Sequence, residues 1–453
     1  MSPSTDTIAA LATPSGTAAL ATIRISGPDT YRLSSQLFGA APRLRSATHG
    51  DYVGREGSIL DDVVATRYAA PHSYTGEDSL EISCHGSPLV VHRILVDLLA
   101  RGCRAAGPGE FTQRAFLNGR MDLSQAEAVM DVISARSDRA LAAAQQVLRG
   151  ALGRHLAKLV EGVVAALSTV EAYIDFPEED LPLEDRKRLE ERIAEVLRGT
   201  EQLLATERTG AYLREGMATV ILGAPNAGKS SLMNRIVGTE RAIVSPEPGT
   251  TRDFIEEVVR VGPHGLRLVD TAGLNPDAAG IESVGIGKTL ERAAGADLYM
   301  LVLDATRPAP PLPDALGGRI APSNTLVVVN KVDLLAEGGK PVPSILPGFQ
   351  SVRVSALTGD GMDSLLDGLS RMADGLQQTF GDERITINVR HSHFLVEARA
   401  CLQSALAKVA TNGPGELLAS DLRGAMGALG EIFGKVDNER VLDQLFASFC
   451  IGK

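Results

Sequence analysis

The sequence predicts a multi-domain protein of the α/β and α classes, in which an α/β domain interrupts a helical domain that follows an N-terminal α+β domain. A glycine-rich loop at 223–230 lies between an apolar run and a segment with helical spacing, as in α/β domains. Long segments with helical periodicity flank this region, at 122–174 and from 391 onward. The 453 residues suffice for two or three domains.

We place the domain boundaries where this periodicity changes. The predicted domains are an N-terminal domain at 1–118, an α/β domain at 215–375, and a discontinuous helical domain at 119–214 and 376–453. In the first of these, LATIRISG and DDVVATRY have strand character, and LVVHRILVDLLA is a predicted helix that Gly102 ends. The segment RPAPPLPDALGGRIAPSN of the α/β domain is too rich in proline and glycine for a long helix, so we expect a short helix or a loop there.

The glycine-rich loop reads GAPNAGKS and matches G-x-x-x-x-G-K-[ST] in the strand–loop–helix context that this phosphate-binding motif requires. Backbone N–H groups of such a loop surround the phosphates, and the following helix adds partial positive charge. We expect Lys229 to reach the β- and γ-phosphates and Ser230 to bind Mg²⁺.

Two downstream segments supply further parts of a phosphoryl-transfer site. GTTR at 249–252 is spaced as a switch loop that brings a hydroxyl to the metal, and Thr251 is the predicted second Mg²⁺ ligand. DTAG at 270–273 follows a predicted strand, so that Asp270 is suited to hold Mg²⁺ through water.

Two more segments predict that the base is guanine. In NKVD at 330–333, the Asp333 carboxylate can accept two N–H bonds from guanine, a donor pair that adenine lacks. Ser355-Ala356-Leu357 closes the far side of the base. A phosphate loop alone could be a chance turn, but five ordered elements predict a GTPase with a mostly parallel, Ras-like sheet. The predicted GTP-binding residues are Asn226, Ala227, Gly228, Lys229, Ser230, Ser231, Ser245, Pro246, Glu247, Pro248, Gly249, Thr250, Thr251, Asp270, Thr271, Ala272, Gly273, Asn330, Lys331, Asp333, Ser355 and Ala356.

The second switch region lacks a residue that many small GTPases use. Leu274 follows DTAG where a glutamine often orients the attacking water, and leucine cannot do so. Glu282 is a candidate to position water through a bridging solvent molecule. Spacing alone favours the plainer interpretation of Glu282 as a solvated charge.

The phosphate loop contains a candidate ligand for a monovalent cation. The amide oxygen of Asn226 could coordinate such an ion beside the phosphates, although an Asx turn that only shapes the loop competes with this interpretation. The segment SPEPGT at 245–250 could complete the shell. The predicted K⁺ ligands are Asn226, Ser245, Glu247 and Thr250.

The composition narrows the possible partners and location. The net charge is −11, so the chain as a whole does not attract nucleic acid, and binding one would need a local basic patch or a basic partner. The cysteines show neither C-x-x-C nor metal-ligand spacing, which fits a reducing compartment; they are Cys84, Cys103, Cys401 and Cys450. With neither a signal peptide nor a membrane-length apolar stretch in the sequence, we expect a cytoplasmic protein and no membrane partner.

From end to end, the chain resembles the TrmE family of tRNA-modification GTPases. The resemblance lies in GAPNAGKSSL, PGTTRD, DTAGL and IESVGI, and in the N-terminal DTIAALATPSG and SYTGEDSLEISCHG. It continues through PGEFTQRAFLNGRMDLSQAEAVMD to FCIGK as the last five residues, which is a highly specific signature.

This resemblance implies a folate site in the N-terminal domain, which in the family is similar to folate-dependent aminomethyltransferases. The ligand would be a tetrahydrofolate derivative in its 5,10-methylene or 5-formyl form, and the matching positions are Arg24, Glu81, Arg120 and Lys453. A carboxylate suits the pteridine N–H groups and cations suit the glutamate tail. Taken alone, each would ordinarily be a strand-edge or surface charge. Lys453 would reach this site only if the tail folds back, and we expect it to do so on a dimer partner.

The resemblance also implies the reaction and the partners. A homodimer would act with the flavin-binding MnmG (GidA) protein on the wobble uridine of tRNA, with K⁺-stimulated GTP hydrolysis as a conformational switch. Cys450 could take part in the modification chemistry, or it could be a small buried apolar residue.

Two other functions compete with this one. A ribosome-assembly GTPase would act as a binding switch, but the sequence lacks a KH-like G-x-x-G loop and a Lys/Arg run. A dimeric scaffold with moving helices would leave FCIGK and the N-terminal domain without a role.

Overall fold

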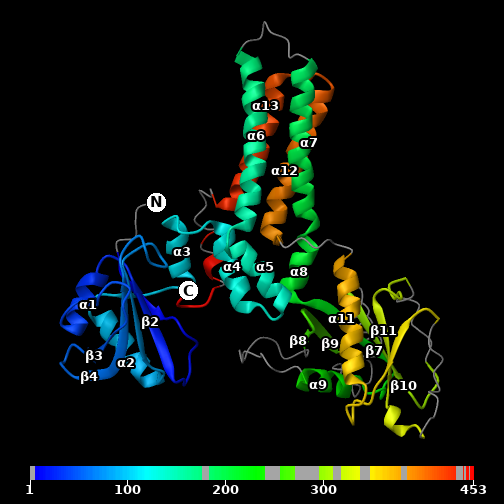
Figure 1. Ribbon diagram of the computed structural model, residues 1–453, viewed down its shortest axis with the longest axis horizontal. Coiled ribbons are helices and arrows are strands. Elements are labelled where there is room, and N and C mark those ends of the chain that lie inside the picture. Colours follow the sequence, from blue (N-terminus) through cyan, green and yellow to red (C-terminus); the bar gives the residue numbers. More distant parts are fainter. Residues whose placement is uncertain are drawn as a thin grey trace, which may run out of the picture. The chain divides into compact units, whose positions relative to one another are not determined.

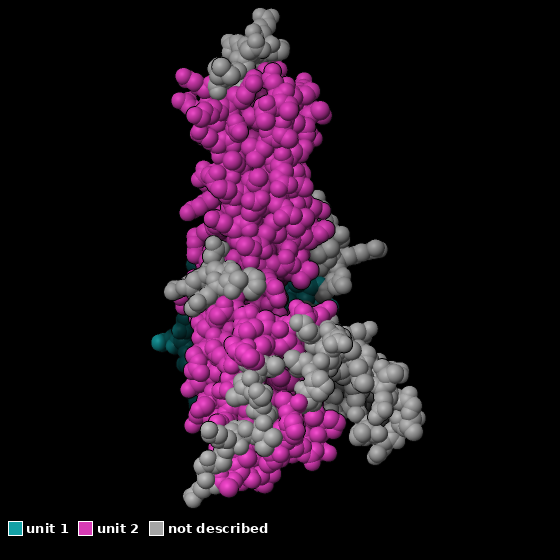
Figure 2. Space-filling model, turned by 90° about the vertical axis from the view of Figure 1, so that its right-hand side faces the viewer, with its two compact units in different colours: residues 1–130, 430–453 teal, residues 131–429 magenta. Residues whose placement is uncertain are grey.

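The chain forms two compact units. The computed structural model describes residues 6–175, 183–239, 256–270, 295–309, 318–336, 347–378 and 385–434, together with 442, 445–447 and 449–453. The first unit consists of Met1–Met130 and Gly430–Lys453, and the second of Asp131–Leu429 (Figure 2). The predicted domain boundaries at 118, 214 and 375 stay predictions.

The first unit is built on a sheet whose strand order is β3-β4-β5-β2-β1-β6. Figure 1 labels three strands of this sheet, β2, β3 and β4. Its strands are β1 (Ile8–Leu11), β2 (Leu20–Ser26), β3 (Thr48–Val53), β4 (Ile59–Tyr68), β5 (Ser79–His85) and β6 (Arg104–Ala105). The short β1–β6 pair is parallel, and the other neighbours are antiparallel. Both segments with predicted strand character are therefore strands, β2 and β4.

Alternation along these strands separates an apolar face from a polar one. Ile23 and Ile25 of β2 are fully buried in a core with helices α1 (Thr30–Phe38) and α2 (Pro88–Ala100). Arg24, between them, points to the opposite face, because successive side chains of a strand alternate. That opposite face carries two of the candidate folate residues, Arg24 and Glu81. The predicted helix is α2, with Pro88 in its first turn.

The chain's last residues pack against helices of the same unit. Phe446 and Phe449 are buried in a cluster with Leu123, the first residue of α4 (Leu123–Ser134). Helix α3 (Glu110–Leu117) precedes α4 and begins next to this cluster. Gly109 has φ +63°, and a Cβ there would lie 2.9 Å from the Phe449 Cβ, so only glycine fits between helix and tail.

The second unit contains a bundle of long helices. Figure 1 shows α6, α7, α12 and α13 side by side. The helices of this unit are α5 (Asp138–Leu148), α6 (Ala151–Asp175), α7 (Leu183–Ala205), α8 (Glu207–Glu215), α12 (Val389–Ala410) and α13 (Gly415–Phe433), the last of which ends in the first unit. Gly162 and Gly199 let α6 and α7 approach closely: a Cβ would lie 2.6 Å from Val196 at the first and 2.7 Å from Leu159 at the second.

The continuous helical spacing predicted from residue 122 is divided in the structure. Ser137 starts α5 by accepting a hydrogen bond from Ala140 N at 3.2 Å, and Gly150, with φ +79°, separates α5 from α6. Hydrophobic periodicity alone did not reveal these two helix ends, because apolar residues continue at helical spacing through both of them. No described helix combines the length and apolar character that a membrane span needs.

The second unit also contains a sheet with strand order β12-β11-β10-β7-β9-β8. Its strands are β7 (Met217–Gly223), β8 (Glu256–Val261), β9 (His264–Asp270), β10 (Leu298–Asp304), β11 (Thr325–Asn330) and β12 (Gln350–Arg353). Only β8 is antiparallel to its neighbour, which confirms the predicted mostly parallel sheet. Helices α9 (Lys229–Thr239) and α11 (Met362–Gln378) pack into a core with these strands.

The strand order fixes where a ligand can bind. Successive connections lead from β7 to the β9 side of the sheet and then to β10 on the other side, so β7 borders a topological switch point. Ligands of open α/β sheets bind at the carboxyl ends of the strands there. The predicted phosphate loop directly follows β7. Of the segment RPAPPLPDALGGRIAPSN, residues 310–317 lie outside the described residues.

Candidate functional site

The phosphate loop has a backbone that only glycine can adopt at two positions. Gly223 has φ +151° and Gly228 has φ +94°. An added Cβ would overlap the Val302 carbonyl oxygen at the first and the Asn330 side-chain amide at the second. The loop therefore lies tightly against β10 and β11, and its backbone shape requires glycine at both positions.

Lys229 and two serines lie where phosphate and metal would bind. The Lys229 ammonium donates to Gly223 O at 2.9 Å and Ala224 O at 3.0 Å, so that it lies within the curve of the loop. Ser230 and Ser231 are exposed in the first turn of α9. A helix N-terminus, an ammonium and exposed serines suit a Mg²⁺-bound phosphate group.

On the side of the site where the base is predicted to bind, two side chains are fixed by hydrogen bonds. Asn330 donates to Ala227 O at 3.0 Å and accepts from Ala356 N at 3.0 Å, and so links the phosphate loop to the loop after β12. The Asp333 carboxylate accepts from Ser355 Oγ at 2.6 Å and remains exposed. This carboxylate is oriented yet free to accept N–H bonds from a base.

Asp304 and Thr306 belong to the same site, although sequence reasoning missed them. Asp304 Oδ2 lies 2.8 Å from the Lys331 ammonium, and Oδ1 accepts from Thr306 N at 2.9 Å and Oγ1 at 2.7 Å. Partial burial opposes ionisation, but Lys331 and Thr306 outweigh it and lower the pKa of Asp304 to about 2. The sequence feature that could have identified them is a pair of polar residues, Asp304 and Thr306, directly after the apolar run LYMLVL.

A large part of the predicted switch regions lies outside the described residues. This applies to the Mg²⁺ ligand Thr251, the water-positioning candidate Glu282, and the K⁺ ligands Ser245, Glu247 and Thr250. It also applies to the predicted GTP-binding residues Pro246, Pro248, Gly249, Thr271, Ala272 and Gly273. Asp270 is the last residue of β9, and Asn226 is exposed in the phosphate loop with φ +63°.

The first unit brings two of the four candidate folate residues into direct contact. Arg24 and Glu81 are paired across β2 and β5, and Arg24 Nε donates to Glu81 Oε1 at 2.9 Å. The Arg24 guanidinium lies 4.8 Å from the ring centre of Tyr74 and 5.7 Å from that of Phe111. The side chains of Arg24 and Glu81 are 15% and 28% exposed, so the pair is partly open to a ligand.

The tail folds back onto this region, and it does so within one chain. Phe111 N donates to Lys453 O at 3.1 Å, and Gly109 N donates to Cys450 O at 3.3 Å. Gly452 has φ +95°, and a Cβ there would overlap the backbone of β1. The expected fold-back is thus present, but the described contact needs no dimer partner. Main-chain oxygens of the tail take up the free N–H groups at the start of α3.

Two further candidate residues of the first unit, Arg120 and Cys450, are exposed. Arg120 lies three residues after the last residue of α3, and its Cγ is 3.1 Å from the position that a Cβ of Gly76 would take, in the loop that carries Tyr74. The Cys450 thiol is exposed, so its interpretation as a buried apolar residue is wrong. Its backbone is held by the hydrogen bond that its carbonyl oxygen accepts from Gly109 N, while its side chain is not buried.

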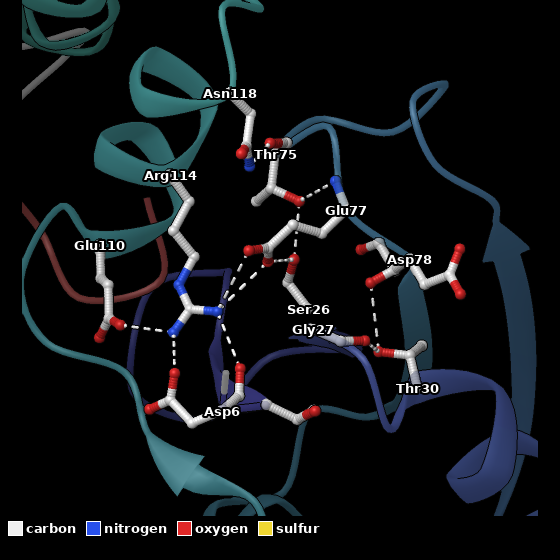
Figure 3. Close-up of polar contacts among 12 residues, drawn as sticks. Asp6, Ser26, Gly27, Thr30, Thr75, Glu77, Asp78, Glu110, Arg114 and Asn118 are labelled. Carbon is white, nitrogen blue, oxygen red and sulfur yellow. Dashed lines mark hydrogen bonds and ion pairs between the residues drawn. The ribbon is translucent and has the colours of Figure 1, made fainter. Parts of the chain in front are cut away.

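Beside this site lies a buried arginine that sequence reasoning did not single out. The Arg114 side chain is 4% exposed and contacts Asp6 at 2.8 Å, Glu110 at 2.9 Å and Glu77 at 3.2 Å (Figure 3). Ser26 Oγ of β2 also donates to Glu77, at 2.8 Å. Burial alone would lower the pKa of Arg114, but the carboxylates raise it. This network fastens α3 to the strand that carries Arg24.

The comparisons with known proteins cover the whole chain. Residues 7–120 match the family model described as the GTP-binding protein TrmE N-terminus, and residues 123–450 match the MnmE helical domain. A protein of Opitutus terrae named tRNA modification GTPase MnmE is 56% identical over 453 residues, which is 100% of each chain. A protein of the same name from Symbiobacterium thermophilum is 42% identical over 457 residues and covers 99% of each chain.

Proposed function

This chain belongs to the MnmE family of tRNA modification GTPases, and from this premise we propose that it helps to modify carbon 5 of the wobble uridine in certain tRNAs. The product would carry an aminomethyl or carboxymethylaminomethyl group. The observation that carries the proposal is the Arg24–Glu81 pair on a polar sheet face, beside which the chain's own tail is docked. A protein that only switched between nucleotide states would not need this second site.

The residues of the first unit fit a tetrahydrofolate ligand, which would supply the one-carbon unit when bound. Glu81 has a second carboxylate oxygen for the N–H groups of a pteridine ring, and Arg24 holds the first. Arg120 and Lys453 are cations that suit the glutamate tail of the ligand. Tyr74 fixes the Arg24 guanidinium by a cation–π contact, which keeps the pair aligned.

The nucleotide site is proposed to use two kinds of cation. Mg²⁺ would be held by Ser230 and Thr251, and K⁺ by Asn226 with Ser245, Glu247 and Thr250, at the contact of two GTPase domains in a homodimer. Glu282 would position the attacking water. The exposed position of Asn226 in the phosphate loop supports its part in this proposal.

The cation proposal has a direct test. GTP hydrolysis should be faster in K⁺ than in Na⁺ buffer, and Asn226→Ala should remove this difference while leaving nucleotide binding largely intact. A rate ratio near one in the unaltered protein would rule the K⁺ site out.

The proposed partners follow from the reaction. The flavin-binding MnmG protein would supply the redox chemistry, and because this chain is acidic, we propose that the partner contributes much of the attraction for tRNA. The four cysteines are free thiols, which fits a reducing cytoplasm.

Nucleoside mass spectrometry of tRNA from cells that lack the gene tests the proposal. The wobble-uridine modification should disappear, return with a plasmid copy, and stay absent with a copy lacking Lys453. Unchanged nucleosides would leave only the GTPase activity, and a ribosome-assembly switch would then explain the chain better.

A further inference from the structure

Lys331 has a backbone conformation that few lysines adopt. Its φ is +68°, in the left-handed region, where a side chain with a Cβ is disfavoured. Such a conformation persists when surrounding contacts hold it, and it is often found at ligand sites. Lys331 begins the turn that leads from β11 to Asp333. Its backbone conformation therefore sets the position of the Asp333 carboxylate, which is predicted to recognise the base.

The contact that holds Lys331 comes from the neighbouring strand. Asp304 ends β10 and is paired in register with Asn330, which ends β11. The Asp304 and Lys331 side chains are 10% and 30% exposed, and the carboxylate and ammonium are 2.8 Å apart. Charge-assisted hydrogen bonds of this length are among the stronger ones in proteins, and partial burial limits their screening by salt.

Asp304 is itself fixed by the residue two positions later. Its Oδ1 accepts from both the backbone N–H and the hydroxyl of Thr306, which leaves Oδ2 directed at Lys331. The carboxylate therefore cannot rotate away from the ammonium without losing both donors. This arrangement is more rigid than an ordinary surface ion pair.

The lysine stem then passes beside the phosphate loop. Lys331 Cε is 4.0 Å from the position that a Cβ of Gly228 would take. The stem thus lies between the loop that surrounds the phosphates and the turn that carries Asp333. A nucleotide bound to both must pass along this stem with its sugar or base.

We propose that Asp304 is a positioning residue of the guanine-nucleotide site, which acts by holding the Lys331 side chain as a wall along the sugar and base. The proposal concerns nucleotide binding and does not depend on the folate site or the tRNA reaction. It predicts that loss of Asp304 weakens the binding of GDP and GTP and raises KM, with little change in kcat.

The test compares two variants of the full-length protein. Asp304→Asn keeps an acceptor for Thr306 but removes the charge that holds Lys331. Asp421→Asn is the matched control, because Asp421 pairs with Lys408 in the helical bundle, with both side chains similarly exposed. We expect Asp304→Asn to weaken binding of a fluorescent GDP analogue about tenfold, as loss of one charge-assisted hydrogen bond would. The Asp421→Asn variant should bind it as the unaltered protein does.

A merely structural role for Asp304 would give a different result. If Asp304→Asn lowers the melting temperature but binds the GDP analogue normally, the proposal is wrong. Thr306→Val provides a milder version if Asp304→Asn does not fold, and should weaken GDP binding by about two- to threefold because one donor to Asp304 remains.

A double-mutant cycle separates action through Lys331 from any other effect. Lys331→Met alone should weaken GDP binding. In that background, Asp304→Asn should cost nothing further, because its partner is already absent. Additive losses would overturn the proposal, since Asp304 would then act on the nucleotide by another route.

Discussion

Arg24 and Glu81 face each other on neighbouring antiparallel strands, and their guanidinium and carboxylate groups are 2.9 Å apart. Both side chains are less than a third exposed. Directly opposed charges stabilise a strand pair modestly, by about 0.2–1 kcal/mol. The additional placement of Arg24 over Tyr74 indicates that the orientation of the pair matters more than its contribution to stability.

Arg24→Ala should therefore weaken ligand binding far more than it weakens the fold. We expect the affinity for 5-formyltetrahydrofolate, measured by calorimetry, to fall at least about tenfold, because Glu81 would lose its alignment. Arg32→Ala removes an arginine that also pairs with a carboxylate, Asp29, but is exposed, and should leave this affinity unchanged. Equal folate binding by the Arg24 variant and the unaltered protein would contradict the site.

Gly452→Ala should displace the tail from the sheet. The added Cβ would overlap the backbone of β1, and φ +95° is unfavourable for alanine, so we expect a local cost of about 1–3 kcal/mol. Hydrogen exchange in residues 449–453 should accelerate, and folate binding should weaken. Gly427→Ala is the control, because its Cβ would meet no atom within 4 Å. Unchanged exchange in the tail of the Gly452 variant would refute the docking.

Replacing Arg114 by Met should destabilise the first unit strongly. Three carboxylates contact this buried guanidinium. Removing it would leave Asp6 and Glu110 with only the half-exposed Arg104 and would deprive Glu77 of its guanidinium contact, a loss of about 3–5 kcal/mol. Arg104 contacts two of the same carboxylates but is 50% exposed, so Arg104→Met should cost no more than about 1 kcal/mol. Thermal unfolding of both variants measures the difference, and similar melting temperatures would show that the buried network is not the stabilising one.

Contacts within one sequence motif could be predicted from the sequence. Contacts that depend on how neighbouring strands are paired could not. Gly228 and Lys229 form the phosphate loop with their immediate neighbours, so spacing was sufficient. Asp304 and Lys331 meet only because β10 and β11 are adjacent and in register, and no spacing rule joins residues 27 positions apart. Asp6 and Arg114, 108 positions apart, meet for the same kind of reason.

The two helix ends on either side of α5 were also not predicted, for a different reason. Apolar residues continue at helical spacing through Ser137 and Gly150, so only the cap and the positive φ divide the helix. Hydrophobic period reports which face is buried and does not report where the axis turns. The corner matters because α5 contacts the α/β part of the second unit through Arg139.

His264 should make the stability of the second unit fall as the pH decreases. Its side chain is 1% exposed and lies 3.0 Å from Asp374, which also contacts Arg139 at 2.8 Å. Burial, together with the charge of Arg139, lowers the pKa of His264 below the ordinary value of 6.5, against the attraction of Asp374. Nδ1 of His264 has no hydrogen-bond partner among the described residues, so a proton there would be poorly accommodated.

Because the folded-state pKa is depressed, the unfolded chain takes up a proton at higher pH than the folded protein does. The stabilisation is present above about pH 6.5 and is lost as the pH falls toward the folded-state pKa, with a slope of at most about 1.4 kcal/mol per pH unit. His264→Gln retains a donor for Asp374 but cannot titrate. Between pH 7.5 and pH 5.5, the melting temperature should therefore fall further for the unaltered protein than for this variant. His49→Gln removes an exposed histidine and should behave as the unaltered protein does. If the His264 variant and the unaltered protein lose the same stability over this range, another group sets the pH dependence, and His264 serves only to join α11 to the turn between β8 and β9.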